Sequence, residues 1–293
     1  MINIRSIGRV LFLSLALCLL VAPAGSADEV KKPAKKSKSA KAQQKETLPA
    51  AQMILEPKAI DILKAASSRL AAARTLSFTA VATHENMSRL GYPLLNTVKG
   101  EVVVQRPDKM RVITPGDGRA FEFYYDGKKI MAYAPVENLV AVADAPPTIE
   151  GMLAEAHRLA AISFPFADML ADDPFKKLEP RLKVAFYVGQ SQVVGGTTTD
   201  IVAIGNDAAF AQLWIGTDDH LPRMIRVMYH DDPAALRFQV EYSNWVLDRE
   251  FPPGTFASAK AESAPRIPFD RPDLERMPAQ DTKTGKGKTG KSK

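Results

Sequence analysis

The middle of the chain consists largely of short segments in which apolar side chains alternate with polar ones. In one of these segments Val98 and Val102 alternate with Lys99 and Glu101. Because successive side chains of a strand point to opposite faces of a sheet, the alternation predicts strands that each bury one face. Strands of this kind are predicted at residues 77–84, 97–105, 109–114, 120–125, 129–134, 139–143, 183–190, 192–204, 210–216, 222–230 and 235–247.

Turn residues indicate how these strands pair. Asp126-Gly127 separates two strand patterns, and both positions tolerate the positive φ angles of a two-residue hairpin. Gly195-Gly196 indicates a further turn. The sheet is therefore predicted to be mainly antiparallel. In the final strand, one face is predicted to carry Leu236, Phe238, Val240, Tyr242 and Val246.

Two regions have the apolar spacing of helices. Residues 57–74 form the first, and its apolar stripe consists of Ile60, Leu63, Ala66, Leu70 and Ala73. The second follows Pro146-Pro147, with Thr148 as N-cap, and it is expected to stop at Pro165. A short helical piece at 166–171 is predicted after it. The apolar stripe of the second helix consists of Met152, Leu153, Ala156, Leu159 and Ala160. A long curved sheet with helices packed on one side satisfies these patterns.

The first 27 residues have the plan of a cleavable signal peptide. Arg5 and Arg9 precede a 12-residue apolar run, which is shorter than the roughly 17 to 25 residues that a membrane span needs. Cleavage is predicted after Ala27, with Ala24 as the alternative. Cys18, the only cysteine, would be lipidated in a lipoprotein, but Leu17 before it does not fit such a signal. The mature protein is therefore predicted to be a soluble periplasmic protein.

Positive charge is concentrated near the ends of the chain. Of the net charge of +6, residues 1–27 carry +2, residues 28–50 carry +4 and residues 260–293 carry +4, whereas residues 51–259 carry −4. The acidic middle argues against a nucleic-acid partner. The basic segments are predicted to be disordered, and they are either solvated tethers or contacts to an anionic membrane surface. The predicted domains are a signal peptide (1–27), a linker (28–55), one folded domain (56–259) and a tail (260–293).

No constellation of residues indicates an enzyme. The four histidines, His84, His157, His220 and His230, lack partners at metal-ligand or catalytic spacing. Asp172-Asp173 and Asp218-Asp219 are adjacent acids in turns, and adjacent side chains point apart. We therefore expect no catalytic residue, no metal and no cofactor.

The order of these elements resembles that of the periplasmic lipoprotein carriers, the LolA/LolB-like superfamily. The positions that carry the resemblance are Gly100, Arg106-Pro107, Lys109, Arg111, Asp126-Gly127-Lys128 and Tyr133. Residues 77–80, 105–109, 123–127, 185–189 and 221–223 are similar to a family of predicted periplasmic proteins of unknown function within that superfamily. Lysine-rich ends, and the absence of any residue that could be tied to delivery, separate this chain from the carriers.

The resemblance implies an α+β fold in which the curved sheet forms an incomplete β-barrel. The N-terminal helix and the central helical insertion would pack on its concave side, the insertion would act as a lid over acyl chains, and an arginine matching Arg106 would help to hold that lid. The candidate ligand-binding residues are Val102, Val104, Arg106, Phe121, Phe123, Tyr125, Leu153, Leu159, Val227 and Phe238.

Three functions compete on this fold. The first is binding of a lipid, acyl chain or other hydrophobic small molecule, the second is capture of a polypeptide by a chaperone or sensor, and the third, an enzyme, ranks last. The same apolar residues would also be required simply to fill a core. A carrier needs a pocket of roughly 300 to 1,000 Å³, so volume separates the two interpretations. The sequence predicts neither the ligand's identity nor the oligomeric state.

Overall fold

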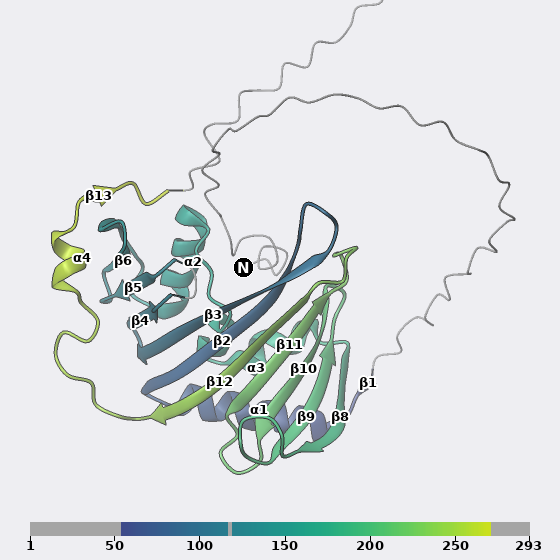
Figure 1. Ribbon diagram of the computed structural model, residues 1–293. Coiled ribbons are helices and arrows are strands. Elements are labelled where there is room, and N and C mark those ends of the chain that lie inside the picture. The colour runs from purple at the N-terminus through teal and green to yellow at the C-terminus, as the bar shows by residue number, and fades with distance from the viewer. Residues whose placement is uncertain (1–53, 117–118, 271–293) are drawn as a thin grey trace, which may run out of the picture.

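The computed structural model describes residues 54–116 and 119–270. They form one strongly curved sheet with helices against it (Figure 1). The order of strands across the sheet is β1-β8-β9-β10-β11-β12-β2-β3-β4-β5-β6-β7-β13, and every pairing is antiparallel except those of the two edge strands. The predicted signal peptide and its cleavage site lie outside the described residues.

The long strands account for most of the described chain. Their bounds are β2 Thr75–Met87, β3 Pro93–Gln105, β4 Lys109–Thr114, β5 Phe121–Tyr125, β6 Lys129–Ala134, β7 Leu139–Asp144, β8 Val184–Ser191, β9 Thr199–Gly205, β10 Ala209–Gly216, β11 Pro222–Tyr229 and β12 Arg237–Leu247. The edge strands are β1 Ile54–Leu55, beside β8, and β13 Arg266–Ile267, beside β7. The predicted curved, mainly antiparallel sheet is confirmed.

Helix α1 (Pro57–Ala72) covers one end of the concave face. Pro57 stands at its first turn, where a missing N–H costs nothing. Its buried residues Ala59, Leu63 and Ala66 pack with Val202 and Ile215 of the sheet. The predicted stripe is therefore confirmed, with Ile60 only half-buried.

Helix α2 (Ile149–Ala160) covers the other end. The Thr148 hydroxyl accepts a hydrogen bond from the Gly151 N–H at 3.0 Å, so the predicted cap is confirmed. The helix ends at Ala161 in the left-handed conformation, four residues before Pro165, which is therefore not what ends it. Three short helices follow, a 3-10 turn η2 (Ala167–Leu170), then α3 (Pro174–Leu178) and η3 (Glu179–Arg181). The last two were not predicted.

Two strand predictions need correction. Residues 192–198 form a turn and not the start of a strand, so β9 begins at Thr199. In β12 a register shift between Ser243 and Val246 reverses the alternation. Val246 is therefore 40% exposed, while Trp245 packs against the main core.

The segment after β12 crosses to the convex face of the sheet. There helix α4 (Ala259–Ser263) packs Ala261 and Ala264 on Tyr133 and Val140, and β13 pairs with β7. Residues 260–267 are therefore folded, contrary to the predicted tail boundary. Lys260 and Glu262 are exposed, and the residues of α4 and its end that are buried are the small Ala261 and Ala264. The polar composition of the segment therefore gave no indication that it packs on the sheet. Residues 271–293 lie outside the described part of the chain.

None of the helices within residues 54–116 and 119–270 combines the length and the apolar character that crossing a bilayer requires.

Candidate functional site

The concave face and the segment 149–171 form one apolar layer. Cross-strand pairs place Val102, Val112 and Phe123 on this face. Aromatic side chains from the segment cover them, with Phe164 edge-on to Phe123 at 5.0 Å between ring centroids and Phe166 edge-on to Phe78 at 5.4 Å. The segment thus closes the sheet through side-chain packing.

Arg106, at the end of β3, holds the far end of this segment. Its guanidinium donates from Nη1 to the Leu170 carbonyl at 3.0 Å and from Nη2 to the Ala171 carbonyl at 3.3 Å. The side chain is 14% exposed, and it lies 3.6 Å from the carboxylate of Asp172, which is 93% exposed. Burial lowers the pKa of Arg106, whereas the charges of Asp172 and Glu150 raise it. The arginine remains charged, as guanidinium groups do in proteins.

Glu150, in the first turn of α2, ties the two ends of the segment together. Its carboxylate accepts a hydrogen bond from the Asp172 N–H at 3.0 Å and pairs with Lys177 of α3. Desolvation raises the pKa of Glu150, but the bonds from Lys177 and Asp172 and the charge of Arg106 together lower it. The carboxylate and Arg106 therefore act on the same stretch, residues 170–172.

The near end of the segment is attached differently. The Ile149 N–H donates to the Pro107 carbonyl at 3.1 Å, and the Tyr125 hydroxyl donates to the Pro146 carbonyl at 2.5 Å. One end of the segment is thus anchored by the Arg-Pro turn and Tyr125, and the other by the side chains of Arg106 and Glu150.

Apart from Arg106, the predicted ligand-binding residues differ in how deeply they are buried. Val102, Val104, Phe123, Tyr125 and Leu153 lie fully within the main core, and Phe121 and Phe238 pack against it half-buried. Val227 is half-buried beside Phe238, its cross-strand neighbour. Leu159 is half-buried near the end of α2 and does not belong to that core cluster.

Beyond the segment, the concave face continues over β11 and β12 with half-buried side chains. Val227, Phe238 and Tyr229 lie here. The nearby Asp168 of η2 is exposed at its surface, but many protein atoms lie around its carboxyl group. Desolvation raises the pKa of Asp168, and Arg181 and Lys177 oppose that shift. Desolvation and the charge of Asp168 raise the pKa of Tyr229 to about 12. Asp168 and Glu150 were not predicted. In the sequence, Asp168 could have been noticed as the one acid within an apolar run. For Glu150 the only sequence feature was its position at the start of a predicted helix.

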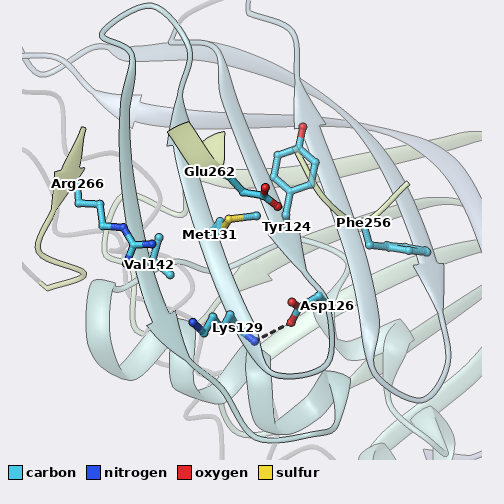
Figure 2. A pocket seen from close by; sticks show the side chains of 8 residues that line it. All are labelled: Tyr124, Asp126, Lys129, Met131, Val142, Phe256, Glu262 and Arg266. Carbon is cyan, nitrogen blue, oxygen red and sulfur yellow. Dashed lines mark hydrogen bonds between the residues drawn. The ribbon is translucent and has the colours of Figure 1, made fainter. Parts of the chain in front are cut away.

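Two cavities lie on the convex face. The first, of about 220 Å³, lies between β5, β6 and β7 and the segment that carries α4 (Figure 2). It is lined by Tyr124, Asp126, Lys129, Met131, Val142, Phe256, Glu262 and Arg266. The second, of about 250 Å³, lies over β2, β11 and β12. Neither is lined by a predicted ligand-binding residue, and both are smaller than the roughly 300 Å³ at which ligand pockets begin.

The open, curved, mostly antiparallel sheet with helices against its concave face is the fold that the resemblance to LolA-like proteins implied. The family model of DUF2092, described as a predicted periplasmic protein, matches residues 59–270, and the chain belongs to this family. The predicted periplasmic location is confirmed by the same match. No protein with a curated description matches the chain.

Several solved structures are similar to this chain. The MucA/MucB complex of Pseudomonas aeruginosa shares 16% identity at a TM-score of 0.40, over 70% of this chain and 62% of that chain. LprF from Mycobacterium bovis shares 15% sequence identity at a TM-score of 0.40, over 67% of this chain and 97% of that chain. A LolA superfamily protein from Nitrosomonas europaea shares 10% sequence identity at a TM-score of 0.33, over 68% of this chain and 97% of that chain. The chain thus spans less than two thirds of the first of these structures.

Proposed function

We propose that this periplasmic protein binds an acyl chain, a lipid or another hydrophobic ligand between the concave face of the sheet and the segment 149–171. The observation that supports this function is the attachment of that segment. An apolar layer is packed on an apolar sheet. Arg106 joins its far end to the sheet through two carbonyls, and Glu150, within the segment itself, accepts from the Asp172 N–H. The segment lies on the sheet through side-chain contacts and not through strand pairing. An apolar ligand can therefore replace its side chains on the sheet.

The ligand would take the place of the segment's aromatic side chains. Phe164 and Phe166 fill the space over Phe123 and Phe78 in the described structure. A ligand that enters must therefore displace the far end of the segment, while the near end at Ile149 stays attached to Pro107. Closed and open states of this kind exchange through a hinge, and the ligand binds only the open one.

The proposal predicts that Arg106→Leu increases the apparent affinity for a fluorescent fatty acid. Buried hydrogen bonds from a charged group contribute about 1.5 to 3 kcal/mol, and their loss makes the open state more populated. Since apparent affinity scales with the populated fraction of the competent state, we expect a gain of about tenfold or more. Fluorescence titration of the purified protein measures it, together with faster hydrogen exchange in residues 149–171.

Arg111→Leu is the matched control. Arg111 donates to a carbonyl too, that of Thr255 at 3.4 Å, but it holds the chain on the convex face. Its loss should leave fatty-acid binding unchanged. If the wild-type protein binds no fatty acid, lysolipid or apolar dye at micromolar concentration, and lipid extracts of the purified protein are empty by mass spectrometry, the ligand-binding function is wrong. Capture of a polypeptide then becomes the better explanation.

A further inference from the structure

The hairpin between β2 and β3 exposes a concentration of large apolar side chains. Leu90 is 83% exposed and Tyr92 is 70% exposed at its tip, and Met87, Leu94 and Leu95 are also exposed. Several large apolar side chains exposed within one short hairpin are more than the single exposed apolar residues that are normal on a protein surface. These five residues are called the apolar tip below.

The apolar tip projects from the rest of the sheet. The pairing of β12 with β2 ends at His84, and the pairing of β4 with β3 ends at Glu101, whereas β2 and β3 remain paired out to Met87 and Pro93. The hairpin is thus a two-stranded ribbon over its last residues, and it is seen to extend past the neighbouring turns in Figure 1.

The turn at its end is well defined. The Gly91 N–H donates to the Ser88 carbonyl at 3.0 Å, the Ser88 N–H donates to the Tyr92 carbonyl at 2.8 Å, and the Tyr92 N–H donates to the Ser88 hydroxyl at 3.0 Å. Gly91 has a φ of +80°, which a side chain would disfavour. Leu90 is therefore held outward by an ordered turn.

The apolar residues point to both sides of the ribbon. Leu95 is opposite Glu85 on the convex face, whereas Leu94 is opposite Asn86 on the concave face, and Leu90 and Tyr92 lie at the end. A flat protein surface would cover one of these sides only. A fluid apolar medium covers all of them at once, which favours a lipid membrane as the partner.

A cationic cavity lies directly beside the ribbon on the convex face. It is lined by Thr83, Glu85, Leu95, Arg226, Arg237 and Gln239, with a volume of about 250 Å³. Both arginines are exposed, and within the described part of the chain neither guanidinium has an ion-pair partner. The Glu85 carboxylate accepts from the Arg237 backbone N–H at 3.0 Å. Two guanidinium groups against this one carboxylate leave the lining with a net positive charge, and beside a hydroxyl and an amide they match the hydrogen-bonding needs of a phosphate.

We propose that the apolar tip inserts into the surface of an anionic phospholipid membrane and that Arg226 and Arg237 hold a lipid phosphate there. Leu95 belongs to both sites and lies five residues from Leu90, so the cavity is roughly 17 Å or less from the end of the tip at about 3.3 Å per residue. An apolar element that enters the interface by about 5–10 Å brings the cavity to the headgroups.

The surrounding charges are compatible with this orientation. Arg89 lies at the tip itself, and residues 28–50 contain seven lysines and three acids. Two acids of the neighbouring turns have partners, since Asp207 pairs with Lys183 and the Asp232 carboxylate accepts from the N–H groups of Ala234 and Leu236. Asp231 lies beside them and is exposed.

Cosedimentation of the full chain with vesicles tests the proposal. Vesicles of phosphatidylglycerol and phosphatidylethanolamine provide the anionic surface, and phosphatidylcholine vesicles the neutral one. Leu90→Asp should weaken partitioning to the anionic vesicles about tenfold or more, because a buried leucine contributes about 1.5–3 kcal/mol. Val193→Asp is the control, since Val193 is 90% exposed in the turn at the opposite end of the sheet, and partitioning should stay within about twofold.

Arg226→Gln combined with Arg237→Gln should weaken binding to the anionic vesicles about thirtyfold, at about 1 kcal/mol per basic residue, and should weaken binding to the neutral ones less, because the choline group of phosphatidylcholine balances its phosphate. Arg74→Gln combined with Arg249→Gln removes the same charge from the opposite end. An equal loss in both double variants would overturn the phosphate site. Wild-type binding that Leu90→Asp leaves intact, or no binding of the wild type to either vesicle, would overturn insertion of the tip.

Discussion

Replacing Phe123 with alanine is expected to lower the free energy of unfolding by about 3–5 kcal/mol. The side chain is 0% exposed, lies on the concave face and meets Phe164 edge-on at 5.0 Å. Its removal leaves a cavity between the sheet and the segment 149–171, and packed interiors relax only partly around such a cavity. The midpoint of urea unfolding, with an unchanged slope, measures the loss.

Phe121→Ala is the matched control two residues away on the same strand face. Phe121 is half-buried at the edge of the same core, so its loss should cost about 1–2 kcal/mol. Equal costs for the two variants would contradict the described packing. A small cost for Phe123→Ala would show that the space over it is not filled by Phe164 in solution, and that the concave face is open without ligand.

The strands could be predicted from the sequence because each buries one face. The bounds of β4 and β6 agree with the predicted 109–114 and 129–134, since turn residues flank both strands closely. The pattern failed where the backbone departs from regular alternation. In β12 the register shift after Ser243 places Asn244 at a φ of 56°, and Trp245 takes the inward position that alternation assigned to Val246.

The candidate site could be predicted only in part. Alternation placed Val102, Phe123 and Phe238 on one face, but it carried no information on which of them a helix would cover. The partners of Arg106 are backbone carbonyls, which every residue possesses, so no sequence pattern marks Leu170 and Ala171 as acceptors. The role of Arg106 was implied by family resemblance and not by its neighbours in the chain.

The end of the folded domain was misplaced for a related reason. Composition after residue 259 is polar and basic, and such composition argues against a buried element. What the segment buries is small: Ala261 is 0% exposed, and Ala264 lies beside it against Tyr133 and Val140. Alanines contribute little to a hydrophobicity pattern, yet they allow a helix to approach a sheet closely.

Ending the chain after Ser258 is therefore expected to destabilise the protein strongly, whereas ending it after Asp270 is not. The shorter chain loses α4 and β13, exposes Tyr133 and Val140, and removes the bond from the Val140 N–H to the Pro265 carbonyl. Burial of side chains of these sizes contributes about 1.5–3 kcal/mol each.

We expect a loss of about 3 kcal/mol for the shorter chain, which in a domain of this size lowers the melting temperature by roughly 6–12 °C. The chain ending at Asp270 should melt within about 2 °C of the full chain, since it retains the contacts of α4 with Tyr133 and Val140 and the pairing of β13 with β7. Ala261→Asp in the full chain tests the same contact without truncation, because it places a charge where the alanine is fully buried. Thermal unfolding followed by circular dichroism compares all three. Equal melting temperatures for the two truncated chains would mean that the segment does not stabilise the sheet, and that the domain ends near residue 259 after all.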